Sequence, residues 1–405
     1  MRILFLTDTF MPEATAPAIR TLEHAKEWQK QKDVKVTIIT CVPNYPAGKV
    51  FDGYKNKFYQ KEIIDGIEVI RVWSYMAPNS GFLKRVLDFI SFAIMAFFVG
   101  LFQKFDIVIA TSPQFFTTWA GFALSKIKRK PWIFEVRDLW PESIKAVGAI
   151  KNNLAIKFLE KIELGLYKSS DKIVVVSDAF KDNLIFRGIN GDKIDVVTNG
   201  SNLDLFKPQE KNEKLLNDLK LQNKLVVGYI GTHGMAHGLD FIIKALKNIQ
   251  DDRVHFLFVG DGAVKSDIVK LAEVLRLTNI TFLNPVNKIE VPKYLSLCDI
   301  SLVPLRNNET FNSVIPSKIF ESSAMQIPIL LGVCGQARLI IEKYNAGIYF
   351  EPENQDDFLL KLNLLISDKN LYKNCQNGCL ALANDFDRKV LANKMLCVIR
   401  NIVGL

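Results

Sequence analysis

The sequence predicts an α/β protein of two doubly wound, Rossmann-like domains, and three features support this fold class. Short β-branched runs alternate with longer helical patterns, the order expected of parallel βαβ units. Several runs are continuously apolar, as in parallel strands that are buried on both faces. The runs also fall into two series, separated by a turn-rich and charged stretch. With 405 residues, the chain is long enough for two such domains.

The strand and helix patterns define the domain boundaries. Predicted strands cover 2–6, 34–40, 67–72, 106–110, 132–135 and 172–176, then 225–230, 255–259, 280–282, 300–303, 329–331 and 347–350. Helical patterns lie between them, for example over 18–30, 153–168 and 239–247. Between the two series, Asn199-Gly200 and Pro208 are turn signals.

We therefore expect an N-terminal domain over 1–200 and a C-terminal domain over 201–384. The segment 385–405 has the pattern of a helix, and we expect it to pack back on the N-terminal domain. Ligands of doubly wound sheets bind outside the carboxyl ends of the strands. The cleft between the two sheets is therefore the expected ligand site.

Composition and charge narrow the class of protein. Hydrophobic residues make up 49% and charged residues 23%, which excludes a disordered or collagen-like chain. The net charge of +9 suits nucleic acid, an anionic membrane or phosphorylated ligands. No basic run is interleaved with aromatic residues, so nucleic acid is not an expected partner. The densest basic cluster, 126–130, is equally consistent with a solvated helix end.

The cysteines and the N-terminus favour a cytoplasmic protein. Among the six cysteines only Cys375 and Cys379 are close in sequence, and no nearby His or Cys completes a zinc site. We interpret them as reduced thiols and expect no metal and no cofactor. The apolar run at the N-terminus is too short for the core of a secretory signal.

Residues 86–102 raise the question of a membrane contact. This apolar run contains Asp88, is preceded by Lys84-Arg85 and is followed by Lys104. A spanning helix needs about 20 apolar residues, so a span is the least favoured interpretation. A buried core helix and an interfacial helix that docks on a bilayer remain as the two alternatives.

Two glycine-rich turns follow predicted strands of the C-terminal domain. The segment 228–239 includes His233 and His237, and its glycines would let backbone N–H groups approach a diphosphate. A phosphate or sugar contact is the functional interpretation, and a structural turn is the alternative. The second turn, 259–262, could contact a nucleoside through Gly260 or could simply be a tight turn.

The segment 316–321 has the pattern of a helix start. Lys318 is misplaced with respect to the helix dipole, which favours anions at that end. The position makes sense if Lys318 and the free N–H groups hold a phosphate together. Glu321 lies one turn deeper, where a carboxylate could accept two hydrogen bonds from a ribose diol. The alternative is an exposed Lys–Glu pair.

Two charged residues follow a predicted strand of the N-terminal domain. Asp138 could take a proton or bind sugar hydroxyls, and Arg137 could contact a phosphate. A structural ion pair is the alternative for both. The segment 111–113 ends the preceding strand and is expected at the same edge of the sheet.

Taken together, these motifs resemble the GT-B glycosyltransferases of family four. The resemblance rests on T-N-G-S-N-L-D-L-F-K-P, V-G-Y-I-G-T-H-G-M-A-H-G-L, F-V-G-D-G and V-I-P-S-K-I-F-E, which follow the family's order and spacing over essentially the whole chain. The stretches W-S-Y, G-F-L-K-R and F-E-V-R-D-L-W-P-E-S are most similar to the WbuB-type subgroup, assigned as N-acetyl-L-fucosamine transferases of O-antigen and capsule assembly.

The resemblance implies a fold, an activity and a set of site residues. It implies two Rossmann-like domains around a cleft, a UDP-sugar donor on the second domain, a polyprenyl-diphosphate-linked sugar acceptor on the first, and retention at the anomeric carbon without a metal. Its implied donor-binding residues are Gly231, Thr232, His233, His237, Gly260, Ser317, Lys318 and Glu321. The acceptor-binding candidates are Ser112, Arg137, Asp138 and Glu142, and the catalytic candidates are Asp138 and Lys318.

Three positions depart from the family pattern. The first Glu of the usual E-x₇-E motif is Ser313, so only the ribose-binding Glu321 carries over. Thr232 and His237 stand where a basic pair is usual, which leaves Lys318 as the candidate cation for the diphosphate. Thr111 or Ser112 stands where a His is frequent. No general base is evident there, and the leaving diphosphate itself is thought to serve as the base in retaining members.

We therefore expect a cytoplasmic transferase, peripheral at the inner face of the cell membrane and contacting it through 86–102. Two alternatives belong to other functional classes. A GT-B sugar-nucleotide epimerase would need no lipid-facing helix, and a non-catalytic UDP-sugar-binding scaffold would bind UDP without consuming a donor.

Overall fold

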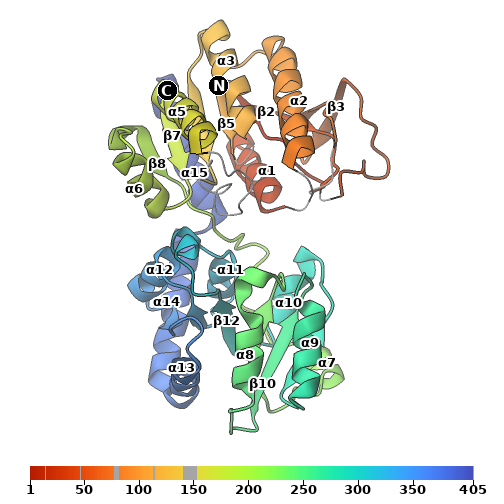
Figure 1. Ribbon diagram of the computed structural model, residues 1–405, viewed down its shortest axis with the longest axis vertical. Coiled ribbons are helices and arrows are strands. Elements are labelled where there is room, and N and C mark those ends of the chain that lie inside the picture. The colour runs from red at the N-terminus through yellow and green to blue at the C-terminus, as the bar shows by residue number, and fades with distance from the viewer. Residues whose placement is uncertain (14, 46, 77–81, 113–114, 140–152, 405) are drawn as a thin grey trace. The chain divides into compact units, whose positions relative to one another are not determined.

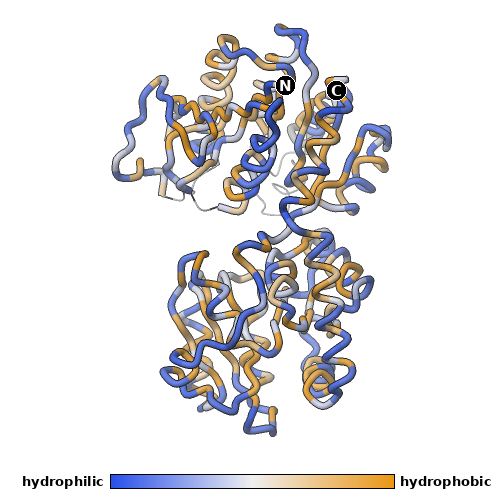
Figure 2. The backbone as a smooth tube through the Cα atoms, turned by 180° about the vertical axis from the view of Figure 1, so that it is seen from behind, coloured by the Kyte–Doolittle hydropathy of each residue, from blue (hydrophilic) through white to orange (hydrophobic). Residues whose placement is uncertain are grey.

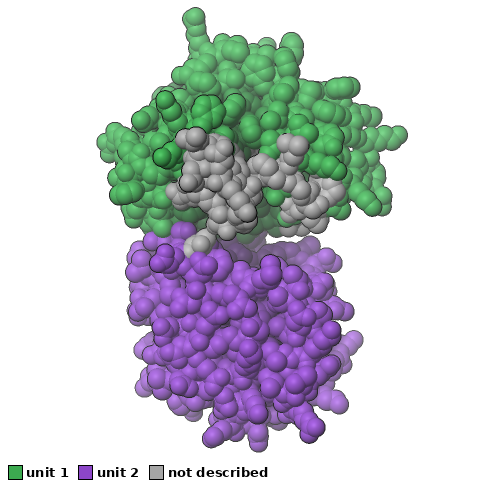
Figure 3. Space-filling view, viewed as in Figure 1, with its two compact units in different colours: residues 1–199, 388–405 green, residues 200–387 purple. Residues whose placement is uncertain are grey.

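The structure is a computed structural model that describes residues 1–13, 15–45, 47–76, 82–112, 115–139 and 153–404 (Figure 1). The chain divides into two units, one formed by residues 1–199 and 388–405 and the other by residues 200–387 (Figure 3). Each unit has its own sheet with helices on both faces. The predicted fold class of two doubly wound α/β domains is confirmed.

Unit 1 contains an eight-stranded sheet in the order β3-β4-β2-β1-β5-β6-β7-β8. All neighbouring strands are parallel except β3 and β4. Asp65 and Gly66 join these two strands with φ angles of 49° and 82°, as a two-residue hairpin turn requires. The strands are β1 (Arg2–Leu6), β2 (Lys35–Cys41), β3 (Tyr59–Ile64), β4 (Ile67–Val72), β5 (Ile107–Thr111), β6 (Trp132–Val136), β7 (Lys172–Val175) and β8 (Ile194–Val196).

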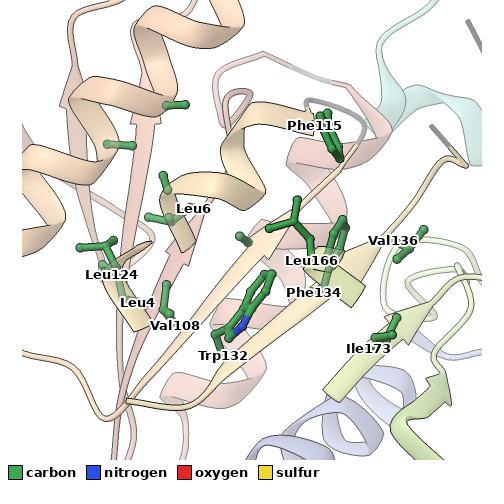
Figure 4. Close-up of a cluster of buried hydrophobic side chains, with 14 of the residues drawn as sticks. Leu4, Leu6, Val108, Phe115, Leu124, Trp132, Phe134, Val136, Leu166 and Ile173 are labelled. Atoms are coloured by element: carbon green, nitrogen blue, oxygen red, sulfur yellow. The ribbon is translucent and has the colours of Figure 1, made fainter. Parts of the chain in front are cut away.

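The alternation of side chains along these strands divides the core of unit 1 into two layers. On one face, α1 (Ala16–Gln29) and α15 (Arg388–Val403) pack on Ile3, Phe5 and Ile38. On the other face, Leu4, Leu6 and Val108 lie in a cluster with α2 (Phe82–Leu101), α3 (Phe115–Lys128) and α5 (Asn153–Ser169) (Figure 4). Among the described residues of this unit, the remaining helices are α6 (Asp178–Phe186) and the short η1 (Gly191–Lys193).

The C-terminal helix α15 completes the first of these layers, as the sequence predicts. The indole Nε1 of Trp28 donates a 2.7 Å hydrogen bond to the carbonyl of Ala392, and both residues are buried. Arg388 forms an ion pair with Glu23 of α1, and Arg400 lies 3.1 Å from Asp33. Helix α15 is therefore part of the core of unit 1, although Trp28 and Ala392 are more than 350 positions apart in sequence.

Unit 2 contains a six-stranded parallel sheet in the order β11-β10-β9-β12-β13-β14. The strands are β9 (Leu225–Ile230), β10 (Val254–Val259), β11 (Ile280–Leu283), β12 (Ile300–Pro304), β13 (Ile329–Gly332) and β14 (Gly347–Tyr349). The helices are α7 (Glu213–Asp218), η2 (Met235–His237), α8 (Leu239–Leu246), α9 (Lys265–Val274), η3 (Lys288–Glu290), α10 (Val291–Leu295), η4 (Glu309–Ser313), α11 (Lys318–Ala324), α12 (Gln336–Tyr344), α13 (Gln355–Ser367) and α14 (Lys369–Asp385).

Each sheet has a point where the order of its strands reverses. In unit 1, β1 lies between β2 and β5, and in unit 2, β9 lies between β10 and β12. The loops that leave two such strands diverge, so a crevice opens outside their carboxyl ends. Ligand-binding residues are therefore expected in the turns after β1 and β9.

Candidate active site

The turn after β9 brings Gly231 against the side chain of Lys318. Gly231 has a φ of +144°, in the region that favours glycine. A Cβ atom on Gly231 would lie 2.6 Å from Cε and 2.8 Å from Nζ of Lys318. The backbone angle therefore favours glycine at this position, and the end of the Lys318 side chain occupies the space that a side chain on residue 231 would need.

Lys318 is the first residue of α11, and its ammonium points back to β9. Its Nζ lies 4.8 Å from the centre of the Tyr229 ring, in a cation–π contact. Burial lowers the pKa of Lys318 to about 8; the charge of Glu321 raises this pKa and that of Lys288 lowers it. The site thus holds a cation in partly desolvated surroundings, where it would attract an anion more strongly than a solvated lysine does.

Glu321 lies one turn further along α11 and is only 7% exposed. Its carboxylate forms an ion pair with Lys288 of η3, whose Nζ also lies 5.0 Å from the centre of the Phe206 ring. The alternative of an exposed Lys318–Glu321 pair is therefore not what the structure shows. Lys288 is absent from the residues that the sequence predicts, and only its position shortly after the end of β11 could have suggested it.

The two glycine turns pack tightly against each other. A Cβ on Gly260 would lie 1.9 Å from the carbonyl oxygen of Gly231, and Gly260 has a φ of +151°. This contact explains the glycine without a nucleoside. His233 lies beneath the turn with 0% exposure, and neither ring nitrogen has a hydrogen-bond partner. Burial lowers its pKa to about 4, so the ring is neutral. A donor contact for Gly260 and His233 stays a prediction.

The loop that contains His237 is fixed by Arg306. The Arg306 guanidinium donates 2.9 Å to the carbonyl of Met235 and pairs with Asp240 at 2.6 Å. A further ion pair at 2.9 Å joins it to Glu353. Burial lowers the pKa of His237 to about 4. His237 is thus neutral near pH 7 and does not replace the missing basic residue, while Arg306 is already paired with two carboxylates.

The remaining predicted donor residues lie at the same edge of the sheet. Thr232 is exposed, and its carbonyl accepts a 2.6 Å hydrogen bond from the Tyr229 hydroxyl. Ser317 is exposed and does not cap α11 with its side chain. Helix α11 starts at Lys318, two residues after Pro316. Together, a half-buried cation, a glycine turn and a buried carboxylate can hold an anionic group and a diol.

The predicted acceptor residues of unit 1 lie at the carboxyl ends of β5 and β6. Ser112 is buried, and its Oγ accepts a 2.9 Å hydrogen bond from the backbone N–H of Arg137. Its hydroxyl therefore holds the turn that presents Arg137 and Asp138. Glu142 lies outside the described residues.

One nitrogen of the Arg137 guanidinium lacks a hydrogen-bond partner. Its Nη1 is buried without a hydrogen-bond partner. Burial lowers the pKa of Arg137 to about 10; the charge of Glu135 raises it and that of Arg20 lowers it. Glu135 itself pairs with Arg20 at 3.1 Å, and Arg20 also donates to the carbonyl of Val197 at 2.8 Å. A desolvated guanidinium with a free donor is costly unless an anion accepts from it.

Comparisons with known proteins agree with this geometry. Residues 18–205 match the model of Glycosyltransferase Family 4, and residues 211–378 match Glycosyl transferases group 1. The two matches cover most of the chain, and the protein is a glycosyltransferase of these families with the GT-B fold.

Individual relatives and solved structures are more distant. WcaI of Escherichia coli, assigned as a colanic acid biosynthesis glycosyl transferase, is 25% identical over 85% of this chain and 84% of its own length. TuaH of Bacillus subtilis, assigned to teichuronic acid biosynthesis, is 29% identical over 60% of each chain. The structure of Anabaena Alr3699/HepE in complex with UDP superimposes with a TM-score of 0.73 at 17% identity, covering 99% of this chain and 100% of that one.

The role of Glu321 can be tested by a conservative substitution. Glu321→Gln removes the charge but keeps the shape. A charge-assisted hydrogen bond contributes about 1.5–3 kcal/mol, so we expect UDP to bind roughly tenfold or more weakly. Isothermal titration calorimetry measures this loss, and Glu342→Gln, which alters an exposed ion pair with Arg338, is the control. Unchanged UDP affinity in a folded Glu321→Gln protein would refute the assignment.

The lowered pKa of Lys318 predicts a pH dependence of binding. As the pH rises through about 8, the ammonium loses its proton and its attraction for a diphosphate. UDP affinity should therefore fall by up to about tenfold per pH unit above that value, while the affinity for uridine should not. Lys318→Arg, which stays protonated, should give a flat profile. A wild-type UDP profile that is flat between pH 7 and 9.5 would contradict the prediction.

Proposed function

We propose that this glycosyltransferase moves a sugar from a UDP-sugar donor to a lipid-diphosphate-linked sugar acceptor, in the synthesis of O-antigen or capsular polysaccharide. The observation that carries the proposal is the Lys318 ammonium lying across Gly231 at the switch point of unit 2. The binding of UDP by the structurally similar Alr3699/HepE supports the donor class. The biosynthetic roles in the names of WcaI and TuaH support a surface polysaccharide as the product.

The donor would use the charges of unit 2 as follows. Lys318 would bind the β-phosphate, and Glu321 would accept hydrogen bonds from the ribose hydroxyls. Because Glu321 pairs with Lys288 in the structure, the ribose would have to compete with or displace this ammonium. Negative charge develops on the diphosphate as the sugar leaves, so a cation fixed beforehand favours the transition state over the ground state.

The transfer itself needs no general base from unit 2. In the step we propose, the bond between the anomeric carbon and the β-phosphate oxygen breaks, and UDP departs with the electron pair. The acceptor hydroxyl oxygen bonds to the anomeric carbon on the same side, and its proton passes to the departing phosphate oxygen. This path retains the anomeric configuration, in keeping with the family resemblance.

The acceptor would bind unit 1. The half-buried Arg137 has one guanidinium nitrogen without a hydrogen-bond partner, which suits a phosphate of the lipid diphosphate. Asp138, the next residue, would position the acceptor sugar. We propose N-acetyl-L-fucosamine as the sugar transferred, on the basis of the subgroup that the N-terminal motifs resemble.

A direct test combines the full chain with a panel of UDP-sugars and a lipid-diphosphate N-acetylglucosamine acceptor, with products measured by mass spectrometry. The proposal predicts an acceptor that is heavier by one sugar residue, together with UDP. Epimerised donor without any change in the acceptor would favour the epimerase alternative. Tight UDP binding with no donor consumed would favour a scaffold.

The lipid acceptor requires access to a membrane, and helix α2 supports a peripheral contact. Among the described residues, no helix is long and apolar enough to cross a membrane. The tube of α2 is mostly hydrophobic in colour in Figure 2. Phe92 and Ala96 belong to the core, whereas Phe98 is 54% exposed and Phe102, just after the helix, is 85% exposed. One face of this helix is thus part of the core, and the proposed membrane contact concerns the exposed apolar face opposite to it.

The exposed face of α2 continues onto α3. An open apolar groove of about 550 Å³ lies between them, lined by Ile90, Ala93, Ile94, Phe97, Phe98, Phe116, Trp119, Ala120 and Ala123. Exposed basic residues follow the same two helices. Lys84 and Arg85 lie at the start of α2, Lys104 lies just after its end, and Lys126, Lys128 and Arg129 lie at the end of α3. We propose that this surface rests on the anionic inner face of the cell membrane.

Asp138 should matter for transfer but not for donor binding. We expect Asp138→Asn to leave UDP affinity near normal and to lower the transfer rate by at least about a hundredfold, the lower range for acid–base or positioning groups. Single-turnover assays with saturating donor measure the effect, and Asp192→Asn, on the surface of the same unit, is the control. Near-normal turnover of Asp138→Asn would reduce the residue to a structural role.

The membrane contact can be tested with liposomes. The wild type should bind anionic vesicles with an affinity that weakens in salt, as the basic residues are screened, but persists through its apolar face. Replacing Phe98 and Phe102 by Ser should abolish the persistent part without unfolding. Phe97 packs partly against the core and is therefore left intact. Replacing Ile185 and the 92%-exposed Phe186 of α6 by Ser is the matched control. A wild type that ignores vesicles at every salt concentration would remove this claim.

A further inference from the structure

Unsatisfied carboxylate oxygens gather at the switch point of unit 1, in the turn between β1 and α1. Oδ1 of Asp8 and Oε2 of Glu13 are both buried, and neither has a hydrogen-bond partner. Buried polar atoms are paired in the large majority of cases, so two such oxygens in one short turn point to a ligand. Neither residue belongs to the site described above.

Glu13 is fixed by its surroundings and is only 2% exposed. Its Oε1 accepts hydrogen bonds of 2.7 Å from the backbone N–H groups of both Asn44 and Tyr45. The guanidinium of Arg71 binds the carbonyl of Met11 and, at 2.9 Å, that of Cys41, which holds the turn from its other side. One oxygen of the carboxylate thus anchors the loop, and the other remains available as an acceptor.

Asp8 is held just as firmly through its backbone. Its carbonyl accepts hydrogen bonds from Thr40 Oγ1 at 3.1 Å and from Cys41 Sγ at 2.8 Å. Burial raises the pKa of the Asp8 carboxyl well above its ordinary value, and the charges of Glu13 and Asp88 raise it further, while Arg85 lowers it. Asp8 and Glu13 are therefore electrostatic neighbours, and their position is set by contacts that do not use their free oxygens.

The position of Asp8 and Glu13 in the sheet relates them to the acceptor residues proposed above. Asp8 follows β1, and β5 and β6 are the next strands in the sheet, followed by Ser112 and Arg137 respectively. Neighbouring strands are about 4.8 Å apart, so the ends of β1 and β6 are separated by roughly 10 Å. An unsatisfied cationic donor after β6 and unsatisfied carboxylate acceptors after β1 thus share one edge of one sheet.

We propose that Asp8 and Glu13 bind the hydroxyl groups of the acceptor sugar, while Arg137 binds its phosphate. This inference rests on the proposed function and adds the sugar-binding part of the acceptor site. An ionised carboxylate accepts hydrogen bonds from sugar hydroxyls, and a carboxyl that burial keeps protonated can both accept and donate. A neutral polyol therefore suits Asp8 and Glu13 in either protonation state. A metal ion is a weaker candidate, because no group of three metal-ligating side chains occurs in the part of the chain that the structure describes.

The test measures binding of the acceptor to the full chain by calorimetry, with N-acetylglucosamine diphosphate carried on a ten-carbon isoprenoid tail as the probe. Asp8→Asn and Glu13→Gln should each weaken acceptor binding at least about tenfold and leave UDP affinity unchanged. Asp106→Asn, just before β5 at the opposite edge of the same sheet, is the matched control and should bind both ligands normally.

Thermal unfolding separates a binding role from a structural one. Because burial disfavours the ionised form of Asp8, Asp8→Asn should keep or raise the melting temperature at pH 7.5 while it weakens acceptor binding. A purely structural role predicts a lower melting temperature and intact binding in the fraction that stays folded.

Other outcomes are equally decisive. If Asp8→Asn binds the acceptor as the wild type does, or if the wild type does not bind it, the inference is wrong. If the wild type binds the acceptor but consumes no donor, the proposed transfer fails while this binding site stands. If the wild type transfers sugar and Asp8→Asn does so with an unchanged acceptor KM, the proposed function stands and the inference fails.

Discussion

The contact between Lys318 and Gly231 is the constraint on which the candidate active site depends. A lysine at the start of α11 reaches back across the turn after β9 and occupies the space that a side chain on residue 231 would need. The Lys318 ammonium makes a cation–π contact with the ring of Tyr229. Burial lowers the pKa of Lys318. The fold thus places a partly desolvated cation at the switch point of unit 2, where a doubly wound sheet binds its ligand.

The charged groups of both units are arranged at a cost to stability. Glu321 is buried against Lys288, the Arg137 guanidinium has a nitrogen without a partner, and Asp8 and Glu13 each have a free carboxylate oxygen. Such groups lower the stability of an empty protein, because water would solvate them better. All of them lie at or near the carboxyl edges of the two sheets. Selection for the proposed binding roles, rather than for folding, would account for charged side chains at these positions.

Much of the fold was predictable, because its strands are buried on both faces and stand out as apolar runs. Strand β3 is half exposed and is not among the predicted strands, although Asp65-Gly66 is a recognisable hairpin turn. At the site, the glycine turn and Lys318 follow from local sequence. Lys288 and Arg306 do not, since each meets its partners through contacts between segments distant in sequence. The sequence likewise does not predict the burial of His233 or the hydrogen bond from the Arg137 N–H to Ser112. Both depend on contacts with residues that are distant in sequence.

Whether Lys318 provides the positive charge for a diphosphate can be measured in one calorimetric comparison. UDP and uridine share the base and ribose and differ only in the diphosphate. Lys318→Ala should therefore weaken the binding of UDP by a much larger factor than that of uridine, in a protein that remains folded. Equal losses for the two ligands, or no loss for UDP, would place Lys318 away from the diphosphate and contradict this account of the site.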